Sequence, residues 1–304
     1  MLGGIELILD KLLVTNYGDN SINIIDRKDL SIIASVDLKE ILSKETGCTR
    51  LLLDSDYRVL VLDSDNDSLY RIDILRKKMI GHVKLGRCPI RMLSYKNGIF
   101  VLNMDSNSLT IVDRKDLHLI ENINIGEKPM DMAIDRIKGK LFISNLNGYG
   151  ISIVDCNGGD IKEFRLSFMP FRIKEELGLV YILGFSNNNT LVESIISALD
   201  LKKEEILWQK KVRGIYYDFI KDNGKDYYYL VNSEDGWLYI FNKASEDLRK
   251  ELYIGGLTNY IISDGYYLYL NDLVNDKLVI VDKDKMQIKK RITVGIEPHD
   301  ILLT

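Results

Sequence analysis

The 304-residue chain has little of several residue types on which common site chemistries depend. It contains three cysteines, three histidines, four prolines and two tryptophans. An odd number of cysteines does not suggest a disulfide framework. Without a CxxC pair, and with so few histidines, the sequence disfavours a zinc or iron–sulfur site. A CxxCH haem-attachment motif and a glycine-rich phosphate loop are also absent, so we expect no cofactor and no metal.

Long apolar runs and a dominant charge are missing as well. The formal charge is −4, with 41 basic and 45 acidic residues scattered along the chain. A basic face for nucleic acid is therefore not expected. No apolar run approaches the roughly 20 residues of a membrane span. Residues 1–10 lack a basic n-region and carry Glu6, so they are a poor signal peptide. We expect a cytoplasmic monomer, or an extracytoplasmic or cell-surface protein if a leader was removed.

What is present is a repeat. Residues 11–26 form an apolar run, a turn of Asn, Gly, Asp and Ser, and a second apolar run that ends in Ile-Asp. The closing position returns at intervals of 40 to 47 residues. Seven copies at a period of about 42 residues define a repeat protein. Its seven closing residues are Asp26, Asp73, Asp113, Asp155, Asp200, Asn242 and Asp282.

Each repeat is expected to contain four short strands. Apolar and β-branched runs separated by Asn, Asp and Gly are typical of hairpins. Four antiparallel strands per 40 to 45 residues form one propeller blade. The sequence therefore predicts an all-β, seven-bladed β-propeller in which the closing residues lie in the third strands. Around Asp113 the predicted strands are Ile90–Leu93, Ile99–Asn103, Ser108–Val112 and Leu117–Ile123.

Two insertions interrupt the regular spacing. Asp37–Thr46 lengthens the link after the first repeat and is expected to form a helical turn, whereas Asn187–Ile195 enlarges a turn in the fifth. No Pro-rich or Ser-rich linker divides the series, so we expect residues 1–304 to form one domain.

The repeat resembles a known family. Leu13-Val-Thr-Asn16, followed by Asn20–Asp26, is similar to the YVTN-type β-propeller repeat, with Leu13 in place of the usual Tyr. The linking Val-Gly-x-x-Pro element appears as Val294–Pro298 and more loosely as Ile125–Pro129. The resemblance covers nearly the whole chain and implies the propeller architecture. It implies no activity, because the family serves varied roles.

The two ends of the chain offer competing inner strands for the first blade. Ile5–Leu9 is one candidate, and Glu297–Thr304 begins another repeat at the C-terminus. An unpaired blade edge exposes backbone donors and acceptors. We therefore predict that the C-terminal segment pairs into the first blade and closes the ring.

The prolines locate a candidate site. All four occupy one repeat position, before the innermost strand, where a missing N–H suits a strand start. Residues one and two positions beyond each proline, or its equivalent, are expected around one mouth of the central channel. They are Arg50, Arg91, Asp131, Arg172, Tyr216, Tyr217, Asn259, His299 and Asp300.

Two interpretations of this set stay open. Three arginines in one ring would bind a carboxylate or phosphate, with an excess of positive charge over Asp131 and Asp300. Alternatively, Arg91 pairs with Asp131, and Arg172 or Arg50 pairs with Asp300, in a structural charge ring.

His299 supplies the catalytic alternative, because a histidine beside Asp300 can act as a general base. No serine or cysteine nucleophile is visibly paired with it. His82 and His118 fall in outer-strand segments.

A metal loop is disfavoured. Asp63–Ser68 begins like an EF-hand, but its sixth position is Ser68 and its twelfth is Ile74. It lies where other repeats have a hairpin turn. Cys48 and Cys88 occupy equivalent positions in neighbouring repeats and are expected to be small, partly buried thiols.

These observations favour a non-catalytic binding or scaffold propeller for a protein, a peptide or a small anionic ligand. The alternative is a lyase-like or hydrolase-like enzyme that uses His299 with the arginines. An accessory subunit in electron transfer is a third class, for which the sequence offers no cofactor ligand.

Overall fold

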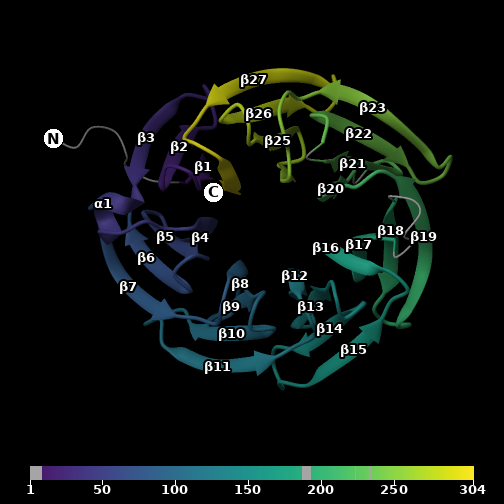
Figure 1. The fold of residues 1–304 in the computed structure, drawn as a ribbon, viewed down its shortest axis with the longest axis horizontal. Helices are drawn as coiled ribbons and strands as arrows, with labels where there is room; N and C mark the ends of the chain where they lie inside the picture. The colour runs from purple at the N-terminus through teal and green to yellow at the C-terminus, as the bar shows by residue number, and fades with distance from the viewer. Residues whose placement is uncertain (1–8, 187–192, 223, 233) are drawn as a thin grey trace.

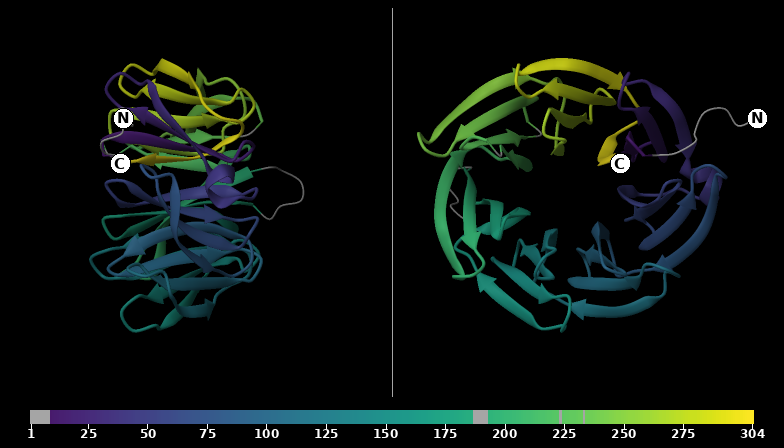
Figure 2. Two further views of the ribbon diagram at one scale, coloured as in Figure 1. Left: turned by 90° about the vertical axis from the view of Figure 1, so that its left-hand side faces the viewer. Right: turned by 180° about the vertical axis from the view of Figure 1, so that it is seen from behind.

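The computed structural model describes residues 9–186, 193–222, 224–232 and 234–304. Within these residues, seven four-stranded antiparallel sheets surround a central axis (Figure 1). The strands of each blade cross the thickness of the ring, as the side view shows (Figure 2). The predicted all-β, seven-bladed propeller is confirmed.

The blades are numbered along the chain, and the innermost strand of each is given first. Blade 1 contains β28 (Pro298–Leu303), β1 (Lys11–Asn16), β2 (Ser21–Asp26) and β3 (Ile32–Asp37). Blade 2 contains β4 (Cys48–Ser55), β5 (Arg58–Asp63), β6 (Ser68–Asp73) and β7 (Lys78–Lys84). Blade 3 contains β8 (Pro89–Tyr95), β9 (Gly98–Asn103), β10 (Ser108–Asp113) and β11 (Leu119–Asn124). Blade 4 contains β12 (Pro129–Asp135), β13 (Lys140–Asn145), β14 (Gly150–Asp155) and β15 (Ile161–Arg165).

The remaining three blades follow the same order. Blade 5 contains β16 (Met169–Glu176), β17 (Leu179–Phe185), β18 (Glu193–Asp200) and β19 (Glu205–Arg213). Blade 6 contains β20 (Asp218–Lys221), β21 (Tyr227–Val231), β22 (Trp237–Asn242) and β23 (Asp247–Tyr253). Blade 7 contains β24 (Ile261–Ser263), β25 (Tyr267–Asp272), β26 (Lys277–Asp282) and β27 (Gln287–Thr293).

The predicted boundaries around Asp113 lie within two residues of the observed strands β8 to β11. The insertion after the first repeat forms helix α1 (Leu38–Leu42), and the Asp37 side chain caps it by accepting a hydrogen bond from Glu40 N at 2.9 Å. The predicted helical turn is therefore confirmed. Two other predictions fall largely outside the described part of the chain. They are the enlarged turn at Asn187–Ile195, of which residues 187–192 are not described, and the candidate strand Ile5–Leu9, of which residues 5–8 are not described.

The core lies between neighbouring blades. The two middle strands of a blade are buried on both faces, so their sequences are nearly continuous apolar runs rather than alternating ones. Leu13 and Ile24 of blade 1, for example, pack in one cluster with Val59, Val61 and Ile72 of blade 2. The outer strands face solvent, and most of β11 is exposed.

The repeated Ile-Asp or Val-Asp ending has a physical cause in the turn that follows it. Asp26 Oδ1 accepts a hydrogen bond from Lys28 N at 2.8 Å, and Asp113 Oδ1 accepts one from Lys115 N at 2.7 Å. A carboxylate that bonds to the backbone two residues on stabilises a tight turn. The same turn recurs at Asp155, Asp200 and Asn242.

The C-terminus closes the ring as predicted. Strand β28 lies at the inner edge of blade 1 beside β1 (Figure 1), with Ile301 opposite Val14 and Leu303 opposite Leu12. The Asp300 N–H donates to Thr15 Oγ1 at 2.8 Å. In the described residues, no helix is long and apolar enough to cross a membrane.

Deleting Pro298–Thr304 should lower the stability of the ring. The deletion exposes the inner edge of β1 and removes the buried Ile301 side chain, whose burial alone stabilises by about 2 kcal/mol. We expect the melting temperature, followed by circular dichroism, to fall by at least about 5 °C. A truncated chain that melts with the parent would show that β28 does not hold the ring closed.

Candidate functional site at the centre of the ring

Each blade places one side chain at the same register around the channel, from its innermost strand in blades 1 to 6 and from the residue just before β24 in blade 7. In blades 2 to 5 a register shift falls between the first strand residues and this position, and such a bulge re-aims a side chain. All seven residues line a central cavity of about 260 Å³. In blade order they are Asp300, Arg50, Arg91, Asp131, Arg172, Asp218 and Tyr260.

Five of these seven residues belong to the predicted set, and two were missed. In blades 6 and 7 the residues predicted at this register were Tyr216, Tyr217 and Asn259, whereas the structure has Asp218 and Tyr260 there. No proline marks the strand start in these two blades. Blade 2 lacks it too, with Cys48 at that position, but there the prediction of Arg50 is correct.

The remaining predicted residues lie beside the ring rather than in it. Tyr216 is 2% exposed and belongs to the apolar cluster between blades 5 and 6. Asn259 accepts a hydrogen bond from Asn271 Nδ2 at 2.7 Å. The His299 ring packs 5.6 Å from the Tyr17 ring, centroid to centroid, and His299 is not among the residues that line the cavity.

The three ring carboxylates connect neighbouring blades. Asp300 Oδ2 accepts a hydrogen bond from Leu51 N of blade 2 at 2.8 Å. Asp131 accepts one from Ile173 N of blade 5 at 3.2 Å, and Asp218 accepts one from Ile261 N of blade 7 at 3.1 Å. Each bond joins a blade to the innermost strand of the next, so these carboxylates have a structural task.

Each carboxylate also has a cation. Arg50 Nη1 lies 3.1 Å from Asp300 Oδ1, and Arg91 Nε lies 2.7 Å from Asp131 Oδ1. These two ion pairs are the ones that the charge-ring interpretation predicted. The third cation, Lys174, was not predicted, and its Nζ lies 3.4 Å from Asp218 Oδ1.

The predicted charge excess needs correction. Asp218 is a third carboxylate beside Asp131 and Asp300, so the three ring arginines alone are balanced. Lys174 lines the same cavity two residues after Arg172. With it, four cations face three carboxylates, so the excess of one positive charge appears only when Lys174, which was not predicted, is counted.

Arg172 is the cation without a carboxylate. It is 8% exposed, its Nε donates to Tyr217 O at 2.9 Å, and its guanidinium carbon lies 4.4 Å from the Phe171 ring centroid. No carboxylate of a described residue lies within ion-pair distance of it. Burial lowers the pKa of Arg172 to about 10, and the nearby charge of Arg91 acts in the same direction. The charges of Asp131 and Asp218 act to raise this pKa, but neither carboxylate forms an ion pair with Arg172. A buried guanidinium without an ion pair is costly unless an anion joins it.

The contacts of Asp300 bear on the predicted general base His299. Asp300 bonds to Leu51 N and Arg50, and within the residues described no hydrogen bond joins it to the His299 ring. Burial lowers the pKa of His299.

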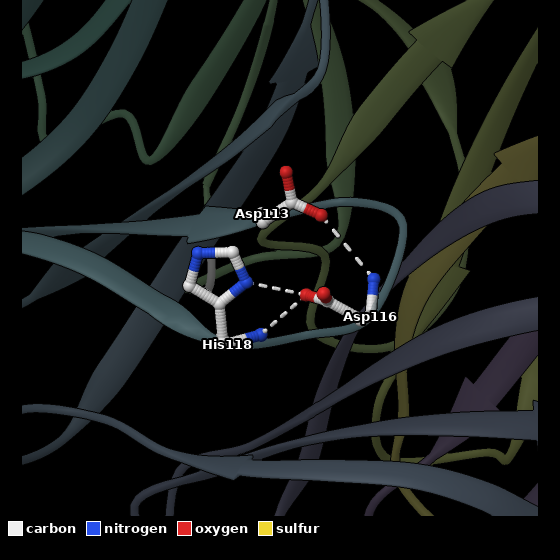
Figure 3. A group of neighbouring side chains, drawn as sticks. All are labelled: Asp113, Asp116 and His118. Atoms are coloured by element: carbon white, nitrogen blue, oxygen red, sulfur yellow. Dashed lines mark hydrogen bonds and ion pairs between the residues drawn. The ribbon is translucent and has the colours of Figure 1, made fainter.

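A possible metal group lies away from the channel. Asp113, Asp116 and His118 gather on the turn between β10 and β11 (Figure 3). Asp113 Oδ1 accepts from the backbone N–H groups of Lys115 and Asp116, as in the equivalent turns of other blades. Asp116 and His118 are exposed and bond to each other. Turn chemistry therefore accounts for this group.

The loop that begins like an EF-hand is also used as a turn. Asp63 Oδ1 accepts hydrogen bonds from Gly47 N at 2.9 Å and from Asn66 N at 3.1 Å. That it binds no metal stays a prediction. Cys48 is fully buried, and burial raises the pKa of its thiol well above the usual range. Burial also raises the pKa of Cys88, which is half-buried.

Comparison with known proteins identifies the fold. No family model matches the chain, and no curated protein matches it. Among solved structures, it is similar to apo AztD from Citrobacter koseri, with a TM-score of 0.67 and 12% identity over 96% of each chain. A putative 6-phosphogluconolactonase from Bacteroides fragilis matches with a TM-score of 0.73 and 13% identity, over 96% of this chain and 97% of that chain. A functionally unknown protein from Desulfotomaculum acetoxidans has the same TM-score of 0.73 at 12% identity, over 96% of this chain and 98% of that one. At such low identity these likenesses establish the propeller fold alone.

Asp300 should give the stability a pH dependence. Burial raises the pKa of this carboxyl to about 6 in the folded protein, although the Leu51 N–H acts to lower it. The unfolded chain therefore releases this proton at lower pH, and folding becomes less favourable as the pH rises from about 4 to about 6. We expect Asp300 to contribute a loss of about 3 kcal/mol in unfolding free energy over that range.

The measurement is urea unfolding between about pH 4 and pH 7 for the parent and for Asp300→Asn, which cannot titrate. The parent should lose more stability across this interval than the variant. Parallel curves for the two proteins would show that Asp300 titrates in the native state as it does in the unfolded chain.

Proposed function

We propose that this propeller is a binding module that takes a carboxylate or phosphate group into its central cavity. The group would belong to a small ligand or to an acidic side chain of a partner protein. The observation that carries the proposal is the Arg172 guanidinium, which is buried at the cavity wall without a carboxylate. As part of the same proposal, we assign the blades to the YVTN-type repeat on the motif around Leu13–Asn16.

The surroundings of Arg172 suit an anion. Lys174 and Arg91 line the same cavity, and both are already paired with carboxylates. They contribute positive electrostatic potential to the cavity, although neither needs a ligand as its counter-charge. Met92, Met132 and Leu302 provide apolar wall. Charge-assisted bonds from a guanidinium strengthen where water is partly excluded. An incoming anion would supply the counter-charge that Arg172 lacks.

Binding accounts for these contacts better than catalysis does. An enzymatic use of His299 would require it to face the cavity with the arginines, but it packs against Tyr17. Asp300 would have to be free, but it bonds to the backbone of blade 2. The putative 6-phosphogluconolactonase shares the fold at 13% identity, which transfers no residue role to this chain.

The test uses acetate, succinate, citrate and inorganic phosphate as probes at constant ionic strength, with calorimetric titration of the parent. At least one probe should bind, and Arg172→Gln should weaken that binding by about tenfold or more, as expected for the loss of a charged hydrogen-bond donor. Arg172→Gln should fold as stably as the parent, because it removes a buried cation that forms no ion pair within the described residues.

Arg165→Gln is the matched control, because Arg165 is an exposed arginine on the outer strand β15. It should bind the probe as the parent does. The proposal fails if no probe binds the parent, or if Arg172→Gln and Arg165→Gln bind equally well.

A further inference from the structure

A second concentration of positive charge lies away from the central cavity, between blades 2 and 3. A cavity of about 430 Å³ opens there beside the hairpin turns that end β10 and precede β5. Every side chain that lines it is polar or charged. The lining residues are Asp54, Arg58, Arg71, Asn97, Asp113, Arg114 and Lys115.

Two of the arginines clamp the blades together around one carboxylate. Arg71 Nε lies 2.9 Å from Asp54 Oδ2, and Arg114 Nε of blade 3 lies 3.2 Å from Asp54 Oδ1. Arg71 also donates to the carbonyl of Lys115 at 3.0 Å, and Arg114 donates to the carbonyl of Asp54 at 2.9 Å. Asp54 thus forms ion pairs with two arginines, so this group of three side chains has a net charge of +1.

Equivalent clamps elsewhere in the ring use a tyrosine in place of the second cation. Asp264 of blade 7 bonds to Arg27 at 2.8 Å and to the Tyr269 hydroxyl at 2.7 Å. Asp222 of blade 6 pairs with Lys283 at 3.4 Å and accepts from the Tyr229 hydroxyl at 3.1 Å. A clamp between blades therefore does not require two cations.

The turn sequences make this comparison close. Asp26–Leu30 in blade 1 and Asp113–Leu117 in blade 3 have the same sequence, Asp-Arg-Lys-Asp-Leu. Arg27 and Arg114 are thus the same residue of the same turn. The junction of blades 2 and 3 differs in having additional positive charge around that turn.

Arg58 adds a further cation that its own blade does not neutralise. The equivalent first residue of the second strand pairs with the turn aspartate in two other blades, as Lys11–Asp26 at 2.8 Å and Lys140–Asp155 at 3.1 Å. Arg58 stands opposite Asp73 in the same register, yet among the described residues no carboxylate pairs with it. Its Nε is buried and lacks a hydrogen-bond partner there.

The charges therefore do not cancel. Four cations, Arg58, Arg71, Arg114 and Lys115, face the carboxylates of Asp54 and Asp113. Asp54 is held by the clamp, and Asp113 Oδ1 accepts from two backbone N–H groups of its own turn. The lining therefore carries an excess of two positive charges. The side chains of Arg58 and Lys115 form no ion pair in the part of the chain that the structure describes.

We propose that this cavity binds a phosphate group, either free or carried on a small molecule. Two cations that line the same cavity without an ion pair among the described residues suit a dianion better than a single carboxylate does. Guanidinium groups also match phosphate oxygens in geometry. The clamp arginines hold the walls in place before the ligand arrives. This site is independent of the central cavity, because the two cavities share no lining residue.

The test is calorimetric titration of inorganic phosphate into the full chain that carries Arg172→Gln, so that the central cavity does not contribute. Phosphate should bind, and the double substitution Arg58→Gln and Lys115→Gln should weaken it by about tenfold or more. Lys28→Gln is the matched control, because Lys28 is exposed and holds the place of Lys115 in the identical turn of blade 1. It should leave binding unchanged.

A second titration with glycerol phosphate distinguishes the two forms of the ligand, since tighter binding than inorganic phosphate assigns a carried phosphate. Lys115→Gln alone, at an exposed position, keeps the test decisive if the double variant folds poorly. The proposal is overturned if phosphate does not bind, if the Arg58 and Lys115 variants bind it as tightly as the starting protein, or if Lys28→Gln weakens it equally.

Discussion

The contact between an aspartate of one innermost strand and the backbone of the next is the constraint on which the centre of this ring depends. A backbone N–H that is removed from water needs an acceptor, and an innermost strand has no fifth strand to supply one. Leu51, Ile173 and Ile261 each obtain it from a carboxylate of the preceding blade. The blades are thereby joined near the axis, where apolar packing between them gives way to the channel.

This solution brings three negative charges into a confined space, and the cations follow from it. Arg50, Arg91 and Lys174 each stand beside one of the carboxylates. Such pairs offset the desolvation of their charges and need no ligand to explain them. Arg172 does not belong to this arrangement, because it forms no ion pair with a carboxylate of the described residues and donates to the Tyr217 carbonyl instead. Charge pairing with the ring carboxylates explains the other three cations but not Arg172, and we therefore assign Arg172 a role in binding.

The sequence predicted the blades because strand periodicity and turn chemistry are local properties. It predicted ring closure because Pro298–Thr304 is visibly an incomplete repeat. It located Arg91, Asp131, Arg172 and Asp300 because a proline two residues earlier marks the register. Blades 2, 6 and 7 lack that proline. The prediction of Arg50 in blade 2 is correct, whereas in blades 6 and 7 it named neighbours of Asp218 and Tyr260. Two further features depend on distances between blades, which no single repeat records. One is the isolation of Arg172, and the other is the gathering of Arg58, Arg71 and Arg114 from three different segments.

The central claim is that an anion completes the charge balance at Arg172. The most direct measurement is anomalous diffraction from crystals soaked in sodium bromide. Bromide is an anion that binds at positively charged sites, and its anomalous signal locates it even when the natural ligand is unknown. The account predicts a bromide peak inside the central cavity, within contact distance of the Arg172 guanidinium and close to Lys174. Bromide peaks that appear on the outer surface but not in the cavity would contradict it.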